Sequence, residues 1–169
     1  MSATRVVDFL NSHHVQYATV VHPEAYSANQ VASAAHIPVK EVAKTVMIKV
    51  DGDLAMAVLP ASRDVDLEVL EAVLDAHRVR LAGESEFRRR FPDCETGAMP
   101  PFGNLYGMKV YVDESLTKDE QITFEAGSHH EAIRLAYADF EKLVRPTVLR
   151  FSTAHIEWRR EADRESPDH

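Results

Sequence analysis

The chain has 169 residues, and its 19 basic and 27 acidic side chains give a formal net charge of −8. This length suits one domain with one hydrophobic core and leaves little room for a second. Neither a membrane-spanning apolar run of roughly 20 residues nor the apolar core of a secretion signal is found. The single cysteine excludes an internal disulfide and a zinc site of the CxxC type. We therefore expect a one-domain cytoplasmic protein without a cofactor, whose acidity makes it a poor binder of long nucleic acid.

The first predicted elements are a helix, a strand and a second helix. Apolar residues recur at near-helical spacing in residues 4–13, and residues 17–21 favour a short strand. Ser27 and Gln30 have the spacing of a capping box. They predict an alanine-rich helix that begins after Ser27 and ends before Pro38, since a residue preceding proline avoids helical geometry.

The strongest strand pattern follows. Residues 44–50 and 54–59 are β-rich runs on either side of Asp51-Gly52-Asp53, which predicts a hairpin. The second run is apolar on both faces, as is typical of a strand in the centre of a covered sheet.

The second half of the chain mixes further helices and strands. Residues 66–76 form an amphipathic pattern, 79–81 a short strand pattern and 84–91 a short charged helix. Three prolines and three glycines in residues 92–107 exclude a regular element there. Strands are expected at 110–112, 121–125 and 132–135, and a closing helix at 138–144. Because the elements do not alternate as βαβ units, we expect an α+β domain over residues 1–150, followed by a polar tail at 151–169 whose end is disordered.

Lys44 is the first candidate for chemistry. Strand alternation places it on one face with Val46, Ile48 and Val50. A lysine at the edge of an apolar face can anchor an anion or act as a desolvated amine. Alternatively, its stem packs on that face while the ammonium reaches water.

The second candidate is the loop Gly97-Ala98-Met99-Pro100-Pro101-Phe102-Gly103. Glycine permits close backbone approach and proline stiffens the chain, so free N–H groups can be held toward one oxygen. Such donors polarise a carbonyl or stabilise an oxyanion. The alternative is a rigid connector, although loops of this length are more often functional.

The remaining candidates each have an ordinary structural explanation. Strand alternation directs at most one of His129 and His130 into a site, and no other ligand stands at metal spacing. Asp113 ends a strand, where it could cap the next turn or bind a substrate ammonium. Cys94 with one of the histidines could form a thiol hydrolase, but no family signature surrounds it.

Five segments, taken in chain order, resemble the YbaK/prolyl-tRNA synthetase-associated editing domain family. The similarity covers about residues 4–145. The segments that carry it are Tyr26-Ser27-Ala28, Val42-Ala43-Lys44-Thr45-Val46, Gly97-Ala98-Met99-Pro100-Pro101, Val110-Tyr111-Val112-Asp113 and Phe124-Glu125-Ala126-Gly127-Ser128-His129.

The resemblance implies a mixed, largely antiparallel, barrel-like sheet with flanking helices and a pocket for an aminoacylated terminal adenosine. It assigns the catalytic role to Lys44 and to the 97–101 loop, whose backbone amides hold the ester carbonyl. It assigns substrate binding to Tyr26, Phe102, Gly103, Asp113 and His129, with His130 as a competitor for the last position. No metal is implied.

The function so implied is a free-standing trans-editing deacylase that hydrolyses the ester of a tRNA mischarged with a small amino acid. The substrate's own ribose hydroxyl, or a water that it holds, serves in place of a protein nucleophile. The partner is the 3′ aminoacyl-adenosine end of tRNA, with an aminoacyl-tRNA synthetase as a second candidate. Additional tRNA contacts, or merely a solvated face, are expected at Arg78, Arg80, Arg88, Arg89 and Arg90. The alternatives are a non-catalytic aminoacyl- or nucleotide-binding module of the same fold and a Cys94-dependent hydrolase.

Overall fold

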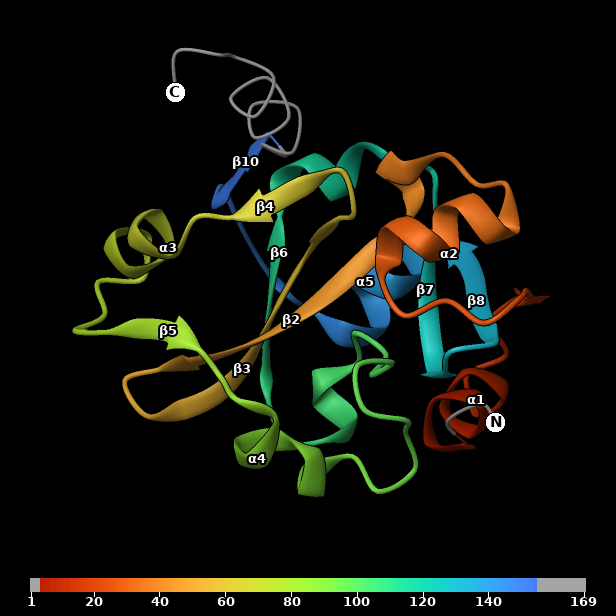
Figure 1. Ribbon diagram of the computed structural model, residues 1–169, viewed down its shortest axis with the longest axis horizontal. Coiled ribbons are helices and arrows are strands. Elements are labelled where there is room, and N and C mark those ends of the chain that lie inside the picture. The colour runs from red at the N-terminus through yellow and green to blue at the C-terminus, as the bar shows by residue number, and fades with distance from the viewer. Residues whose placement is uncertain (1–3, 155–169) are drawn as a thin grey trace, which may run out of the picture.

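The largest of the three sheets in the described part of the chain is built around the predicted hairpin (Figure 1). The computed structural model describes residues 4–154. The strand order is β5-β2-β3-β6-β9, in which β5, β2 and β3 are antiparallel while β3-β6 and β6-β9 are parallel. The bounds are β5 (Val79–Leu81), β2 (Ala43–Val50), β3 (Asp53–Pro60), β6 (Lys109–Asp113) and β9 (Thr147–Leu149).

The second sheet is antiparallel throughout and has the order β1-β8-β7. Its strands are β1 (Tyr17–Val21), β8 (Glu131–Ala136) and β7 (Gln121–Ser128). The two sheets meet where Val42, just before β2, forms a bridge with Thr123 of β7. The predicted α+β fold with largely antiparallel strands is confirmed. The sheet is not closed into a barrel, because β7 and β2 share this bridge and no ladder.

The central hairpin follows the prediction closely. Asp51 and Gly52 form its turn with φ of 49° and 89°, the left-handed geometry of the favoured two-residue hairpin turn. Strand β3 lies between β2 and β6, and its last six residues are buried. Central placement therefore explains why this strand is apolar on both faces.

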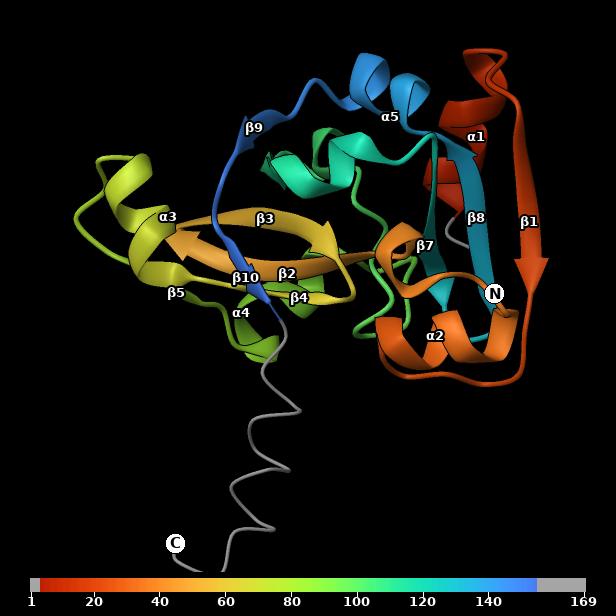
Figure 2. The same ribbon diagram turned by 90° about the horizontal axis from the view of Figure 1, so that it is seen from above.

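Helices cover both faces of the β1-β8-β7 sheet. Figure 2 shows α1 and α5 on one side and α2 on the other, in agreement with the hydrophobic clusters to which they belong. The helix bounds are α1 (Thr4–Ser12), α2 (Ala28–Ala35), α3 (Leu67–Val73), α4 (Glu84–Phe87) and α5 (Tyr137–Val144). Ser27 caps α2 by accepting a hydrogen bond from Gln30 N at 3.1 Å, as its spacing predicted. No helix within residues 4–154 is both long and apolar enough to span a membrane.

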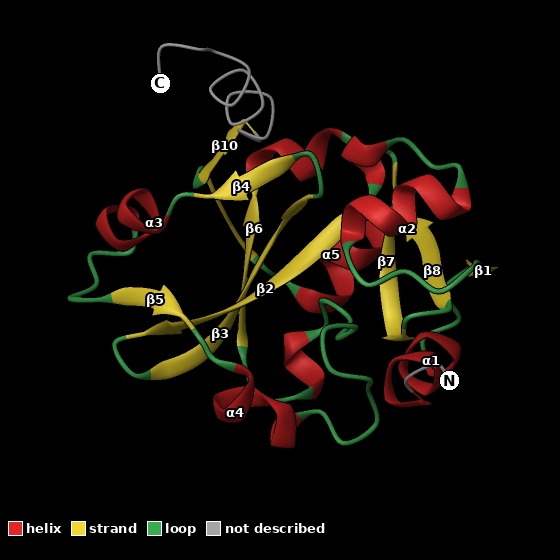
Figure 3. Ribbon diagram, in the orientation of Figure 1, coloured by secondary structure: helices red, strands yellow, loops and turns green. Residues whose placement is uncertain are grey.

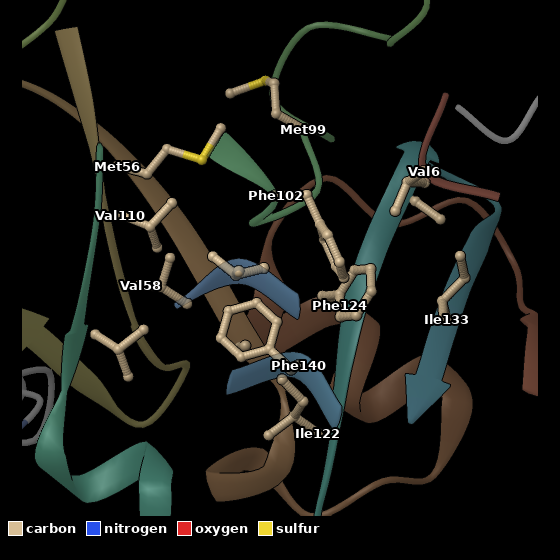
Figure 4. Close-up of a cluster of buried hydrophobic side chains, with 14 of the residues drawn as sticks. Val6, Met56, Val58, Met99, Phe102, Val110, Ile122, Phe124, Ile133 and Phe140 are labelled. Atoms are coloured by element: carbon tan, nitrogen blue, oxygen red, sulfur yellow. The ribbon is translucent and has the colours of Figure 1, made fainter. Parts of the chain in front are cut away.

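The main hydrophobic core fills the space between the two sheets (Figure 4). The Phe102 ring lies 5.4 Å from that of Phe124 and 5.5 Å from that of Phe140, measured between centroids. A smaller core packs Ile48 and Leu59 against Leu70 of α3 and against Phe151. These cores fix the ends of β2 and β7, which carry the site described below.

Short elements account for most of the difference from prediction. Strands β4 (Arg63–Val65), β9 and β10 (Ser152–Ala154) were not predicted, and β4 pairs with β10. Phe151 is 1% exposed, so the packed structure continues past residue 150. The connection from α4 to β6 is largely irregular, as expected from its prolines and glycines (Figure 3). The disorder expected at the end of the tail lies outside the described residues.

Candidate active site

A cavity of about 190 Å³ lies where α2 begins, β2 begins, the Gly97 loop turns and β7 passes beneath. Each of these elements contributes to its wall. The lining residues are Tyr26, Ser27 and Ala28 before and at the start of α2, Ala43, Lys44, Thr45 and Val46 of β2, Gly97 and Met99 of the loop, and Glu125 of β7. Four of the expected site residues therefore meet here, from segments far apart in the sequence.

Lys44 reaches the cavity from the beginning of strand β2. Its Nζ lies 3.4 Å from Asp64 Oδ1 on β4, and its side chain is 23% exposed. Val46 and Val50 pack in the same cluster as Ile48, which agrees with the shared face expected from strand alternation. The ammonium is thus held at the wall by an ion pair while part of it stays accessible from the cavity.

The Gly97 loop offers fewer free amides than its length suggests. Pro100 and Pro101 have no N–H, and Ala98 N donates to the Glu95 carbonyl at 3.0 Å. Gly97 N lies 3.2 Å from Met99 Sδ, which is a weak acceptor. Within residues 4–154, Met99 N has no acceptor. The donors left for a substrate oxygen are therefore those of Met99 and, more weakly held, Gly97.

The loop is fixed to the end of β7 by its neighbours. Gly127 N donates to Ala98 O at 2.8 Å, and Glu95 N donates to Gly127 O at the same distance. Gly97 has a φ of +92°, a conformation that other residues rarely adopt. Backbone hydrogen bonds and one left-handed glycine therefore set the direction of the Met99 amide.

His129 stands behind the cavity wall. Its ring centroid lies 4.7 Å from that of Tyr26, and its Cε1 would lie 3.6 Å from a Cβ placed on Gly97. Nδ1 is 3.1 Å from the Ala25 carbonyl oxygen and Nε2 is 3.0 Å from that of Thr96. The buried ring thus joins the segment before α2 to the Gly97 loop.

The two adjacent histidines differ in their exposure to solvent. His130 is exposed on the β7-β8 turn, whereas His129 is 8% exposed. Glu95 Oε2 accepts a hydrogen bond from His129 N at 2.9 Å, and this bond lowers the pKa of Glu95.

Tyr26 lies at the rim of the cavity and is 63% exposed. Its hydroxyl donates a hydrogen bond to Glu24, which raises the pKa of Tyr26.

Three residues expected to bind substrate lie elsewhere. Phe102 is fully buried in the main core, and Gly103 packs so closely that a Cβ would lie 2.7 Å from Met108 O. Asp113 accepts hydrogen bonds from Ser115 N at 3.1 Å and Phe151 N at 2.9 Å, beside a different cavity. Its carboxylate caps the turn after β6, as the structural explanation expected, and it lies outside the lining of the cavity that contains Lys44; its expected role in substrate binding stays a prediction.

Glu125 is a lining residue that the sequence reasoning missed. Its side chain is 10% exposed, and no donor among the described residues reaches its buried Oε2, which lies 3.6 Å from His129 Nδ1. Burial, with a smaller contribution from the charge of Glu95, raises the pKa of Glu125 to about 8. The available signal was an acidic residue placed directly between two apolar residues of a strand, Phe124 and Ala126.

Other candidate chemistry is absent from this cavity. Cys94 lies beside Asp93 and Tyr106, and burial raises the pKa of its thiol to about 12, which disfavours the nucleophilic thiolate. Residues 4–154 contain no group of three or more His, Cys, Asp or Glu side chains placed to hold a metal ion.

The arginines considered for tRNA contacts divide into two groups. Arg80 donates to both carboxylate oxygens of Glu86 at 2.8 and 2.7 Å, and Arg90 donates to Tyr106 O at 2.8 Å. Arg78, Arg88 and Arg89 are exposed. Two of the five are thus engaged within the fold.

Comparison with known proteins gives consistent matches. A sequence model of the aminoacyl-tRNA editing domain matches residues 22–143. The multifunctional Ser/Thr-tRNA deacylase ProXp-y of Escherichia coli K12 is 25% identical over 152 residues, which cover 87% of this chain and 90% of that protein. A crystal structure of a protein proposed to be a trans-editing enzyme for prolyl tRNA synthetase superposes with a TM-score of 0.76 at 19% identity, over 90% of this chain and 97% of that one. A hypothetical protein of known structure gives a TM-score of 0.78 at 14% identity, over 88% and 99% of the two chains.

Proposed function

The chain belongs to the aminoacyl-tRNA editing domain family, and on this premise we propose that it is a trans-editing deacylase. It hydrolyses the ester that joins a small amino acid to the 3′-terminal adenosine of a mischarged tRNA. An aminoacylated tRNA as substrate places the reaction in the cytoplasm. The E. coli relative is named for Ser/Thr-tRNA, so seryl and threonyl esters are the first candidates.

The observation that carries the proposal is one small cavity that Lys44, Gly97 and Met99 line together. Its volume of about 190 Å³ is below the range of roughly 300–1,000 Å³ common for drug-sized ligands. It suits the aminoacyl group, with the adenosine at its mouth. Steric exclusion then rejects large amino acids, while discrimination among small ones depends on the polar groups of the wall.

Hydrolysis by this site requires no protein nucleophile. The Met99 N–H, assisted by that of Gly97, polarises the ester carbonyl and stabilises its developing negative charge. Lys44 holds the ribose or terminal phosphate by its positive charge. Water, oriented by the neighbouring ribose hydroxyl, adds to the carbonyl carbon. The ester C–O bond then breaks, and the ribose oxygen takes up a proton to give free amino acid and uncharged tRNA.

The test is a panel of tRNAs charged with serine, threonine, alanine, cysteine or a large residue such as phenylalanine. We expect rapid release of a small amino acid and slow release of phenylalanine. If the folded protein hydrolysed none of these esters, the result would contradict the proposal. Tight binding of an ester without turnover would favour the non-catalytic module. Retention of an aminoacyl-tRNA synthetase on the immobilised protein would identify the second candidate partner.

A further inference from the structure

Glu125 is an acid without a counter-charge in the wall of the cavity. Strand alternation turns it away from the main core, so it faces α2 from β7, on the same side as its partner Ala132. Nine-tenths of the side chain is buried, and its Oε2 has no hydrogen-bond partner in the described part of the chain. Such a group costs free energy unless a ligand or a proton compensates it.

The charged neighbours of Glu125 are already engaged elsewhere. Lys44 lines the same cavity but is paired with Asp64, and the Tyr26 hydroxyl donates to Glu24. His129 Nδ1 is closer to the Ala25 carbonyl oxygen, at 3.1 Å, than to Glu125 Oε2, at 3.6 Å. Glu95 contributes a further negative charge. Within residues 4–154, Lys44 is thus paired with another acid, and the nearest nitrogen that can carry a positive charge, His129 Nδ1, faces the Ala25 carbonyl at a shorter distance.

We propose that Glu125 binds the α-ammonium group of the amino acid esterified to the tRNA. The inference rests on the proposed function and names the chemical feature of the substrate that this wall recognises. In an aminoacyl ester, the ammonium is attached to the carbon next to the carbonyl. Once the loop amides hold the carbonyl, the ammonium must therefore lie in the same small cavity. Among the described residues that line it, Glu125 is the one acid.

An ammonium is also the group that most needs such a partner. A buried charge without a counter-ion costs several kcal/mol in general, whereas a buried hydroxyl needs a single neutral hydrogen bond. The carboxyl has a pKa of about 8, so near neutral pH it stays protonated until a cation enters. Binding of the ammonium then favours the carboxylate and releases a proton. N-acylated esters, which carry no such charge, are consequently poor substrates.

The first test compares seryl-tRNA with N-acetylseryl-tRNA. The wild-type protein should hydrolyse the free amine at least about tenfold faster, as expected for one hydrogen bond to a charged group. Glu125→Gln should lose most of its rate on seryl-tRNA, and its preference for the free amine should fall toward the ratio of the uncatalysed hydrolysis rates of the two esters. Glu120→Gln, which removes an exposed carboxyl just before β7, is the control and should keep the wild-type ratio.

Two results would overturn the proposal. One is a folded Glu125→Gln protein that keeps the wild-type preference for the free amine. The other is a Glu125→Gln protein that keeps this preference but no longer distinguishes seryl from alanyl esters. That result would mean that Glu125 recognises the side-chain hydroxyl of serine.

The second test does not depend on turnover. Calorimetry at pH 7 measures binding of an adenosine that carries serine through a stable amide, in buffers of different protonation enthalpy. The wild type should release close to one proton, and Glu125→Gln should release none. Binding without proton release overturns the assignment. Absence of hydrolysis by the wild type would contradict only the proposed function, because calorimetry still decides the role of Glu125.

Discussion

At the scale of single residues, charge at the cavity is set by how each side chain is paired. Lys44 is ion-paired but partly exposed, whereas Glu125 is buried and its Oε2 accepts no hydrogen bond from residues 4–154. The two groups therefore respond differently to substitution. Removal of Lys44 affects what the cavity can bind, and replacement of the buried Glu125 carboxyl also affects the stability of the fold.

Lys44→Ala should lower deacylation by at least about a hundredfold and leave folding nearly unchanged. The reason for the small effect on folding is that a partly exposed ion pair contributes about 1 kcal/mol or less. The chain offers a matched control in Lys49, on the same strand, which pairs with Glu86 at 3.1 Å and is 24% exposed. Lys49→Ala should keep the wild-type rate. Equal rates for the two variants, with similar thermal unfolding, would mean that Lys44 is not the anchor.

The stability of the protein should fall as the pH rises from about 5 to about 8 because of Glu125. Its folded pKa of about 8 lies above that of an unfolded glutamate, so the native state holds the extra proton between these two values. Stability contributed by this proton is present below the unfolded pKa and is lost as the pH rises through about 8. Glu125→Gln should therefore flatten the decline in melting temperature between pH 5 and pH 9, and a parallel decline in both proteins would contradict it.

At the scale of elements, the Gly97 loop acts through backbone shape more than through side chains. Met99→Ala keeps the backbone N–H that we propose polarises the ester carbonyl, so it should keep much of the activity, with a shift in which amino acid fits. Gly97→Val forces a β-branched residue into a φ of +92°, so it should turn the Met99 amide away. Loss of one such donor costs about 2.7–4 kcal/mol in other enzymes, or roughly a hundred- to a thousandfold in rate.

The control for the loop is a glycine strained in the same way but remote from the cavity. Gly107 has a φ of +69° and lines a different cavity, beside Arg90 and Lys109. Gly107→Val should destabilise the fold comparably while preserving most of the rate per folded molecule. Equally small losses of deacylation rate in Gly97→Val and Met99→Ala would instead indicate that the loop only connects two elements.

Sequence reasoning succeeded for elements whose signals are local. The turn at Asp51-Gly52 and the cap at Ser27 each lie within a few residues of the structure that they determine. Strands β4, β9 and β10 have three residues each, and their pairing depends on tertiary contacts with segments far away in the sequence. The same limit explains the site. Lys44 and Gly97 could be identified by motif, whereas the role of Glu125 emerges only when four separate elements form one cavity.

At the scale of the whole molecule, an acidic chain must bind a polyanion through few contacts. The net charge is −8, and Arg80 and Arg90 are already hydrogen-bonded within the fold. Lys44 remains as positive charge at the cavity. Recognition should therefore concentrate on the 3′ end of the tRNA, where the ester itself lies.

This arrangement predicts a weak dependence of kcat/KM on salt. Each phosphate contact with a single strand contributes about 0.7 to the slope of log affinity against log salt concentration. Two or three contacts near the 3′ end give a slope of magnitude about 2 or less, and a short aminoacylated acceptor hairpin should be hydrolysed within about tenfold of the full tRNA. The double variant Arg88→Ala, Arg89→Ala should leave both quantities unchanged. A steep slope that this variant reduces would show instead that the exposed arginines after α4 bind the body of the tRNA, and that the acidic surface is turned away from it.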